Sequence, residues 1–261
     1  MPIRLSLPPA LPERIETAGR SLVGGWVVTS SLVNAEIMGG SGLDLILVDG
    51  EHSTLSLAEI QVHLQVLAAF PVTPLVRVPS GDPALIKQYL DLGVQNLIVP
   101  MVDSAEQAAA VARAAHYPPR GIRGVGSALA RSARWARVDG YLGMASDTLS
   151  LTVQIETANA VSAVDEILAI DGVDAIFVGP ADLAASMGVI GQQDHPDVVS
   201  AVELAIAAAK SAGKPVGVNA FAPAMAERYL AGGADFVFVG ADVQLLARAA
   251  EALADRYIKE G

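Results

Sequence analysis

The 261-residue sequence contains no cysteine, and this absence excludes several kinds of chemistry. A chain without cysteine has no disulfide framework, no thiol nucleophile and no thiolate ligand for a metal ion. Any metal site must therefore be built from carboxylate or imidazole groups. The lack of disulfides also fits a cytoplasmic protein, which is the location we expect.

Positive charge is scarce as well. The 17 Lys and Arg residues stand against 28 Asp and Glu residues, which gives a formal net charge of -11. Nucleic acids and anionic membranes would repel such a chain, because both are held by clustered Lys and Arg side chains. We therefore expect small-molecule partners, and neither a nucleic acid nor a membrane.

Long apolar runs are missing too. No apolar run reaches about 18 residues, and the first residues lack the basic and apolar stretches of a secretion signal. The apolar content is nevertheless 52%, and the mean hydropathy is +0.44. Because this is high for a soluble monomer, we expect other subunits to cover part of the surface.

Short apolar runs alternate along the chain with Ala- and Leu-rich stretches of helical spacing, as expected of buried strands between helices. The eight predicted strands are Leu22–Thr29, Leu43–Asp49, Pro74–Val78, Asn96–Pro100, Leu151–Glu156, Ala175–Pro180, Lys214–Asn219 and Phe236–Gly240. Such strands require a parallel sheet that is covered on its outer face. Eight units in this length predict a single (β/α)8 barrel domain over residues 1–261, a TIM barrel, with an open doubly wound sheet as the alternative.

One connection, residues 117–150, is unusually long, and six arginines lie between Arg113 and Arg137. Loops of this length are usually lids, interface elements or disordered segments. The segment could hold an anionic substrate, or it could form a basic surface that faces solvent or another subunit.

Polar residues at the strand ends are the candidates for chemistry, because the carboxyl ends of barrel strands form the active site in this fold. A charge among apolar neighbours is costly there unless it has a function. The candidates are Asp49, Glu51, His52, Arg77, Gln154, Glu156 and Asp182.

Three of these candidates should lie close together. Gln154 and Glu156 are two residues apart and share one face of their strand, and Asp182 directly follows the next strand. Two neighbouring carboxylates repel each other. The pair therefore needs a shared proton, an Arg partner such as Arg77, or a hard divalent cation such as Mg²⁺ or Mn²⁺.

The other candidates suit acid–base and anion-binding roles. His52 lies three residues after Asp49, so a turn can place the carboxylate beside the imidazole of a general base. The alternative is an ordinary Asp–His surface pair. Arg77 is a fixed charge in an apolar strand, and its planar donors suit a carboxylate or an enolate oxygen, or a buried carboxylate partner.

Six motifs occur in one order: LILVDGEH, VRVP, YLDLGVQNLIVPMVDSAEQA, YPPRGIRGVG, VQIET and FVGPADLAASMG. Together they resemble the HpcH/HpaI family of metal-dependent hydroxy-ketoacid aldolases, over nearly the whole chain. The resemblance implies a class II aldolase, a carbon–carbon lyase of 4-hydroxy-2-ketoacids with pyruvate enolate as nucleophile and an aldehyde as acceptor. It also implies a homohexamer or homotrimer in which C-terminal helices exchange between subunits.

The resemblance also implies roles for particular residues. Glu156 and Asp182 would bind a divalent metal, Mg²⁺, Mn²⁺ or Co²⁺. Arg77 would contact the pyruvate oxygen, and Asp49 and His52 would form an acid–base dyad.

Further residues are implicated less directly. The resemblance puts Gln154 beside the ketoacid and the backbone around Ala181 on its carboxylate. It puts Asp91 at a subunit boundary. We expect Trp26 and Phe221 in the pocket for the aldehyde.

Lysine separates two aldolase mechanisms, because a Schiff-base enzyme needs an amine in its pocket. The four lysines are Lys87, Lys210, Lys214 and Lys259, and none occupies a carboxyl-terminal strand end. Metal polarisation of the carbonyl is the remaining route.

Three alternatives stay open. A CoA-ester lyase of the malyl- or citryl-CoA type would share the barrel and the metal. A phosphate-binding isomerase or epimerase would use the glycines between Gly232 and Gly240. A non-catalytic sensor would leave Asp49, His52 and Arg77 dispensable.

Overall fold

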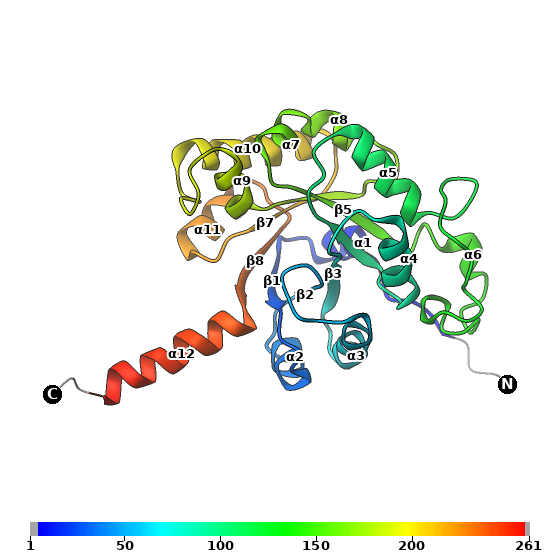
Figure 1. Ribbon diagram of the computed structural model, residues 1–261, viewed down its shortest axis with the longest axis horizontal. Helices are drawn as coiled ribbons and strands as arrows, with labels where there is room; N and C mark the ends of the chain where they lie inside the picture. Colours follow the sequence, from blue (N-terminus) through cyan, green and yellow to red (C-terminus); the bar gives the residue numbers. More distant parts are fainter. Residues whose placement is uncertain (1–4, 259–261) are drawn as a thin grey trace.

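The protein is described by a computed structural model of residues 5–258. Eight parallel strands form a closed barrel in which each strand pairs with the next and β8 pairs with β1 (Figure 1). The strands are β1 (Leu22–Val27), β2 (Leu45–Asp49), β3 (Thr73–Arg77), β4 (Asn96–Val99), β5 (Ser150–Ile155), β6 (Ala175–Val178), β7 (Val216–Asn219) and β8 (Phe236–Ala241). The closed order confirms the predicted (β/α)8 barrel and excludes the open sheet.

Most of the helices connect the strands and cover the outside of the barrel (Figure 1). The helices are α1 (Leu11–Ala18), α2 (Leu32–Gly39), α3 (Leu57–Leu67), α4 (Pro83–Asp91), α5 (Ala105–Ala115), α6 (Tyr141–Met144), α7 (Ala158–Ser162), α8 (Val164–Leu168), α9 (Pro180–Ser186), α10 (Pro196–Ser211), α11 (Pro223–Ala231) and α12 (Asp242–Tyr257), with a 3₁₀ turn, η1, at Arg131–Ala133. Among the described residues, no helix combines the length and the apolar character needed to cross a membrane.

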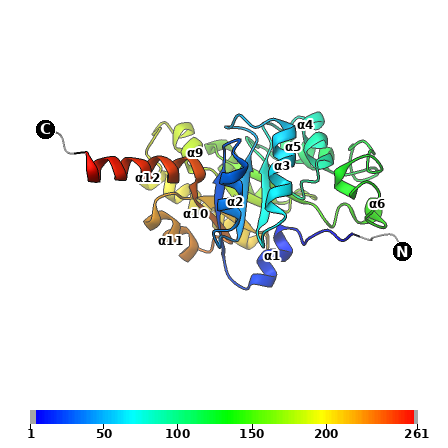
Figure 2. The same ribbon diagram turned by 90° about the horizontal axis from the view of Figure 1, so that it is seen from below.

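The barrel interior is filled by large apolar side chains from alternate strand positions. These residues are Leu22, Leu45, Leu47, Leu75, Ile98, Phe177, Phe236 and Phe238. Gly217 is required by this packing, because a Cβ atom there would lie 2.0 Å from the Phe236 ring. Leu11 of α1 packs on the same cluster and its N–H donates to Asn96 Oδ1 at 2.7 Å, so α1 closes the amino-terminal end (Figure 2). The interior of the barrel can therefore open only at the other end, where the next inward positions are polar.

The long connection does not cover that polar end. It contributes only η1 and α6, and its buried residues Ala133, Val138, Tyr141 and Ala145 pack beside Leu5 and Leu7 of the N-terminal segment. Figure 1 shows this segment, in green around α6, at the side of the molecule where the chain begins.

Helix α12 extends away from the barrel (Figures 1 and 2). Its first residue, Asp242, is the only buried one, and this carboxylate accepts hydrogen bonds from the Val28 N–H at 3.1 Å and from Thr29 Oγ1 at 2.5 Å. Its exposed apolar side chains are Val243, Leu245, Leu246, Leu253 and Tyr257. The barrel thus holds the start of the helix and leaves its apolar residues uncovered.

Candidate active site

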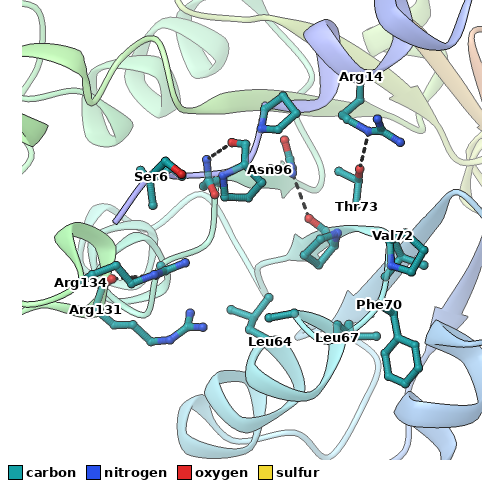
Figure 3. Close-up of a pocket in the computed structure, with 18 residues that line it drawn as sticks. Ser6, Arg14, Leu64, Leu67, Phe70, Val72, Thr73, Asn96, Arg131 and Arg134 are labelled. Atoms are coloured by element: carbon teal, nitrogen blue, oxygen red, sulfur yellow. Dashed lines mark hydrogen bonds between the residues drawn. The ribbon is translucent and has the colours of Figure 1, made fainter. Parts of the chain in front are cut away.

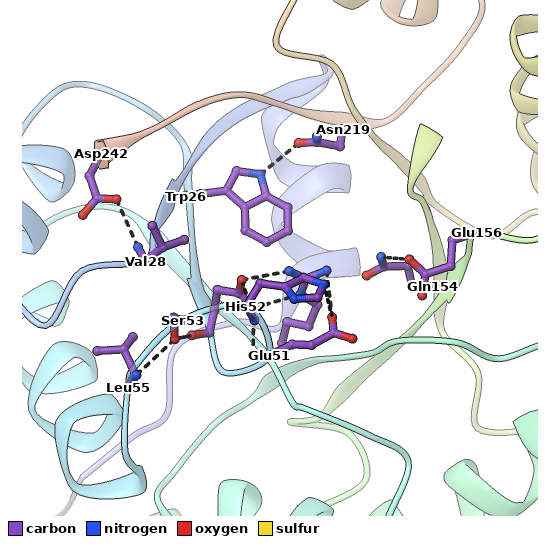
Figure 4. Close-up of polar contacts among 12 residues, drawn as sticks. Trp26, Val28, Glu51, His52, Ser53, Leu55, Gln154, Glu156, Asn219 and Asp242 are labelled. Carbon is purple, nitrogen blue, oxygen red and sulfur yellow. Dashed lines mark hydrogen bonds and ion pairs between the residues drawn. The ribbon is translucent and has the colours of Figure 1, made fainter. Parts of the chain in front are cut away.

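A cavity of about 240 Å³ lies at the carboxyl ends of the strands. Its lining residues are Trp26, Val28, Asp49, His52, Arg77, Gln154, Phe177, Gly179, Ala181, Asp182, Asn219, Phe221, Ala241 and Val243. Eight of the ten predicted site residues line the cavity, and Glu156 and Asp91 do not. Glu156 is nevertheless hydrogen-bonded to Gln154, which does. Figure 4 shows the polar side chains turned toward one another from several strands.

Asp49 and Arg77 form a buried ion pair at the floor of the cavity. They occupy paired positions at the ends of β2 and β3, and the guanidinium donates from Nε to Oδ1 at 2.9 Å and from Nη2 to Oδ2 at 2.8 Å. The third nitrogen, Nη1, lies 2.9 Å from Glu51 Oε2, and the guanidinium carbon lies 4.7 Å from the Trp26 ring centroid. A planar fork held in this way cannot rotate freely, so Arg77 is a fixed, oriented charge.

The arrangement of His52 differs from the predicted dyad. The Asp49 carboxylate accepts the backbone N–H of His52 at 3.2 Å and not its imidazole, because both of its oxygens are already paired with Arg77. The His52 side chain is 69% exposed at the cavity, and its nearest carboxylate oxygen is Glu51 Oε2, at 3.9 Å. Within this chain, the Asp49 carboxylate therefore orients the guanidinium of Arg77. The imidazole of His52 makes no hydrogen bond to Asp49.

The loop after β2 requires glycine at position 50. Its N–H donates to the Arg77 carbonyl at 2.8 Å, and a Cβ atom there would lie 2.5 Å from Tyr89 Oη. Only glycine lets the chain cross the end of β3 so closely. The crossing brings Glu51 and His52 to the rim of the cavity.

Glu51 is a site residue to which the sequence argument assigned no role. Its carboxylate contacts Arg77 Nη1, and burial raises its pKa while the charge of Arg77 lowers it. Its spacing of two residues from Asp49 could have indicated this position, because the same spacing placed Gln154 and Glu156 on one face of their strand. Asn219, which accepts the Trp26 indole N–H at 2.9 Å, was missed in the same way.

Glu156 is buried beside the cavity, with 2% of its surface exposed. Its Oε1 accepts the Met101 N–H at 2.7 Å and its Oε2 accepts the Gln154 amide. Burial raises the pKa of Glu156 to about 7; these two hydrogen bonds oppose the rise, and the nearby Asp182 and Glu51 charges add to it. Met101 adopts a left-handed backbone with φ 56°, a conformation that is costly for a side chain of this size and that concentrates at functional sites.

The groups around Glu156 fit a divalent cation. Asp182 is exposed in the first turn of α9, and no hydrogen bond or ion pair to it is found within residues 5–258. The side-chain oxygen of Gln154 is buried, and no group in the described part of the chain donates to it. No group of three or more His, Cys, Asp or Glu residues in the described part of the chain could hold a metal, so a cation here would have two protein carboxylates and open positions for water or substrate. Hard cations prefer such oxygen donors.

Several other predicted positions can be placed. Ala181 lies in the first turn of α9 at the cavity, and Trp26 and Phe221 line it too. Asp91, at the end of α4, is paired with Arg123 Nη2 at 2.9 Å and does not line the cavity. None of the five arginines of the long connection lines it, and neither do Arg113 of α5 or any residue from 232 to 240.

No lysine of the described chain lines the cavity. Lys87 lies in α4 and Lys210 in α10, where it pairs with Asp235 at 2.8 Å. Lys214 precedes β7 at the opposite end of the barrel and donates to the Val173 carbonyl at 2.6 Å. Lys259 lies outside the described residues.

Comparisons with known proteins identify the family of this chain. The model of the HpcH/HpaI aldolase/citrate lyase family matches residues 22–249. A 4-hydroxy-2-oxo-heptane-1,7-dioate aldolase of Shigella sonnei is 49% identical over 240 residues, 92% of each chain. A crystal structure of an HpcH/HpaI aldolase/citrate lyase family protein from Burkholderia cenocepacia has a TM-score of 0.90 and 36% identity, covering 95% of this chain and 99% of that one. An HpcH/HpaI aldolase from Desulfitobacterium hafniense has a TM-score of 0.86 and 31% identity, with 97% and 99% covered. The chain therefore belongs to the HpcH/HpaI aldolase/citrate lyase family and is a carbon–carbon lyase of the aldolase type.

Proposed function

We propose that this aldolase cleaves and forms 4-hydroxy-2-ketoacids with pyruvate enolate as the nucleophile, an aldehyde as the acceptor and a divalent cation at Glu156 and Asp182. One observation carries the proposal: an oriented guanidinium, an exposed imidazole and the two carboxylates Glu156 and Asp182 lie around one cavity. Within residues 5–258, no lysine lines this cavity and no cationic side chain pairs with either carboxylate. The substrate named for the Shigella sonnei relative is of this class. The single-domain organisation of residues 1–261 and the cytoplasmic location stay predictions.

The cation would supply one part of the chemistry. Bound Mg²⁺, Mn²⁺ or Co²⁺ polarises a carbonyl oxygen and so makes the neighbouring methyl group of pyruvate more acidic. Glu156 and Asp182 would hold it, and Gln154, whose side-chain oxygen lacks a partner, would lie beside the bound ketoacid. The N–H groups around Ala181, in the first turn of α9, would receive the ketoacid carboxylate.

Arg77 and His52 would divide the remaining work. Asp49 and Glu51 hold the guanidinium of Arg77 in one orientation. Its positive charge is therefore already in place when negative charge develops on the ketoacid oxygen. In cleavage, the His52 imidazole accepts the proton of the C4 hydroxyl, the C3–C4 bond breaks, and its electron pair stays with the pyruvate enolate as the aldehyde leaves. Trp26 and Phe221 would pack against the aldehyde.

Release of pyruvate from a panel of 4-hydroxy-2-ketoacids tests this function directly. We expect cleavage of at least one of them, its loss with EDTA, and recovery when Mg²⁺, Mn²⁺ or Co²⁺ is returned. Cleavage of malyl-CoA without ketoacid cleavage would support the CoA-ester lyase instead. A lysine adduct trapped by borohydride and pyruvate would contradict the metal route.

We also propose that the protein forms a homohexamer or homotrimer through α12. The apolar residues of this helix are exposed, as are Leu32, Val33 and Ile37 on α2, and water solvates such side chains poorly. In such an assembly, Asp91 would lie at a boundary between subunits.

Light scattering should therefore show three or six subunits for the unmodified chain. Replacing both Leu246 and Leu253 by Asp should lower the measured mass, because it puts charge into the proposed contact. Gln244→Asp, which adds charge at a polar position of the same helix, is the matched control and should keep the mass. A fully active monomer of the unmodified chain would contradict the proposal.

A further inference from the structure

A second cavity, of about 690 Å³, lies at the opposite, amino-terminal end of the barrel. It forms where the N-terminal segment, the end of α3 and the starts of β3 and β4 meet the turn η1 (Figure 3). Its apolar wall consists of Leu64, Leu67, Phe70 and Val72. No residue of the candidate active site lines it, and its volume suits a small organic ligand.

Two arginines of the long connection line this cavity, and within residues 5–258 neither has a carboxylate partner. Arg131 Nη1 donates to the Leu92 carbonyl at 2.8 Å, and Arg134 Nη1 donates to the Arg131 carbonyl at 2.8 Å. Neither makes an ion pair with a carboxylate of residues 5–258, whereas Arg77 and Arg123 both do. Both arginines are half-buried, so their charges are partly removed from water and only these carbonyl oxygens accept from them within residues 5–258.

The two guanidinium groups converge on one place. A Cβ atom on Gly93 would lie 2.9 Å from Nη1 of Arg131 and 2.9 Å from Nη1 of Arg134, so both nitrogens approach the same point. Figure 3 shows both side chains on the side of the cavity where Ser6 lies. Arg14 lies on the opposite side, where its Nε donates to Thr73 Oγ1 at 3.3 Å.

Burial and mutual repulsion make the two neighbouring positive charges of Arg131 and Arg134 unfavourable when no anion lies between them. Burial lowers the pKa of Arg131 to about 10, with Arg134 adding to the effect, and burial also lowers the pKa of Arg134. With a pKa of about 10, Arg131 still carries its charge at neutral pH. The backbone that presents them is also unusual, since Arg134, Trp135 and Ala136 have consecutive φ values of 50°, 57° and 59°.

We infer that this cavity binds a small organic anion, whose carboxylate or phosphate group lies between Arg131 and Arg134 and whose carbon chain packs on Leu64 and Leu67. Guanidinium groups match such oxygen anions in shape and charge. The chain as a whole carries a net charge of -11, so it repels anions in general. Two neighbouring arginines that no carboxylate of residues 5–258 neutralises offset this repulsion locally. The site is separate from the proposed aldolase site and does not depend on it.

Calorimetric titration with three probes of the same length tests the inference: hexanoate, hexyl phosphate and the neutral hexanamide. We expect the two anions to bind and hexanamide not to bind. The stronger anion identifies the head group that the site prefers. The same titrations on Arg77→Gln separate this site from the aldolase cavity, and we expect the dissociation constants to be unchanged there.

Substitutions at the cavity complete the test. Arg131→Gln and Arg134→Gln should each weaken anion binding by at least about 10-fold, since each removes a charge-assisted hydrogen bond. Ser6→Glu adds a negative charge beside the pair without removing a contact, so it should weaken binding even if a glutamine variant folds poorly. Arg137→Gln is the matched control, because Arg137 is exposed over the Trp135 ring and does not line the cavity.

Three results would overturn the inference. The first is the absence of anion binding by the unmodified protein, and the second is equal binding by all the cavity variants. The third is loss of binding in Arg77→Gln alone, which would assign the anions to the aldolase cavity. If the unmodified protein binds no anion and Arg131→Gln changes the number of subunits, the arginines contact another copy of the chain instead.

Discussion

Asp182→Asn and Glu156→Gln should each abolish measurable aldol cleavage, a loss we expect to be on the order of 10³-fold or more because metal polarisation of a carbonyl is worth several kcal/mol. Each substitution keeps the size of the side chain and removes one of the two carboxylates that face the proposed cation. Binding of Mn²⁺, measured by calorimetry, should be lost in parallel. Asp165→Asn is the matched control, because Asp165 is an exposed carboxylate in the first turn of α8, as Asp182 is in α9.

The binding of Mn²⁺ should also depend on pH in a direction that the geometry sets. Burial raises the pKa of Glu156 to about 7, so a proton occupies this carboxyl below that pH and competes with the cation. Affinity should therefore rise as the pH is increased from about 6 to about 8, the interval around that pKa. Unchanged affinity across this interval, or normal cleavage by Asp182→Asn, would show that the cation is not held there.

The barrel could be predicted from the sequence because its evidence is local. Each strand is a short apolar run, and inward positions alternate with outward ones, so Gln154 and Glu156 were expected on one face, and both are buried beside the cavity. The placement of Asp182 near Glu156 followed from chain order alone, because adjacent strands of a parallel barrel end at the same rim.

The side-chain contacts between neighbouring strands could not be predicted from the sequence. The bidentate pairing of Asp49 with Arg77 depends on the register of β2 against β3, which no local pattern specifies. The sequence therefore favoured His52, three residues after Asp49, as the partner of the Asp49 carboxylate. The left-handed conformation of Met101, which directs its N–H to Glu156, leaves no mark in the sequence because the residue is not a glycine.

His52→Ala should reduce aldol cleavage by roughly 10²- to 10⁴-fold, the usual worth of general acid–base catalysis, and should leave the affinity for Mn²⁺ unchanged. The imidazole is 69% exposed, so its removal should not alter the melting temperature. His195→Ala, which removes another partly exposed imidazole far along the chain, should cleave at the normal rate. If His52→Ala loses the cation, the residue is a ligand; if it cleaves normally, another group moves the proton.

Arg77→Lys should fail in a different way, and the contrast separates a fixed charge from a titratable group. A lysine keeps the positive charge but has one nitrogen where Arg77 uses three, toward Asp49 Oδ1, Asp49 Oδ2 and Glu51 Oε2. The buried Asp49 carboxylate would lose part of its pairing, so the melting temperature should fall along with pyruvate binding and cleavage. Binding of pyruvate, binding of Mn²⁺, melting temperature and cleavage rate, each measured on both variants, distinguish the two losses. Equal pyruvate affinity in Arg77→Lys and the unmodified chain would mean that charge alone suffices and that the orientation provided by Asp49 and Glu51 does not contribute.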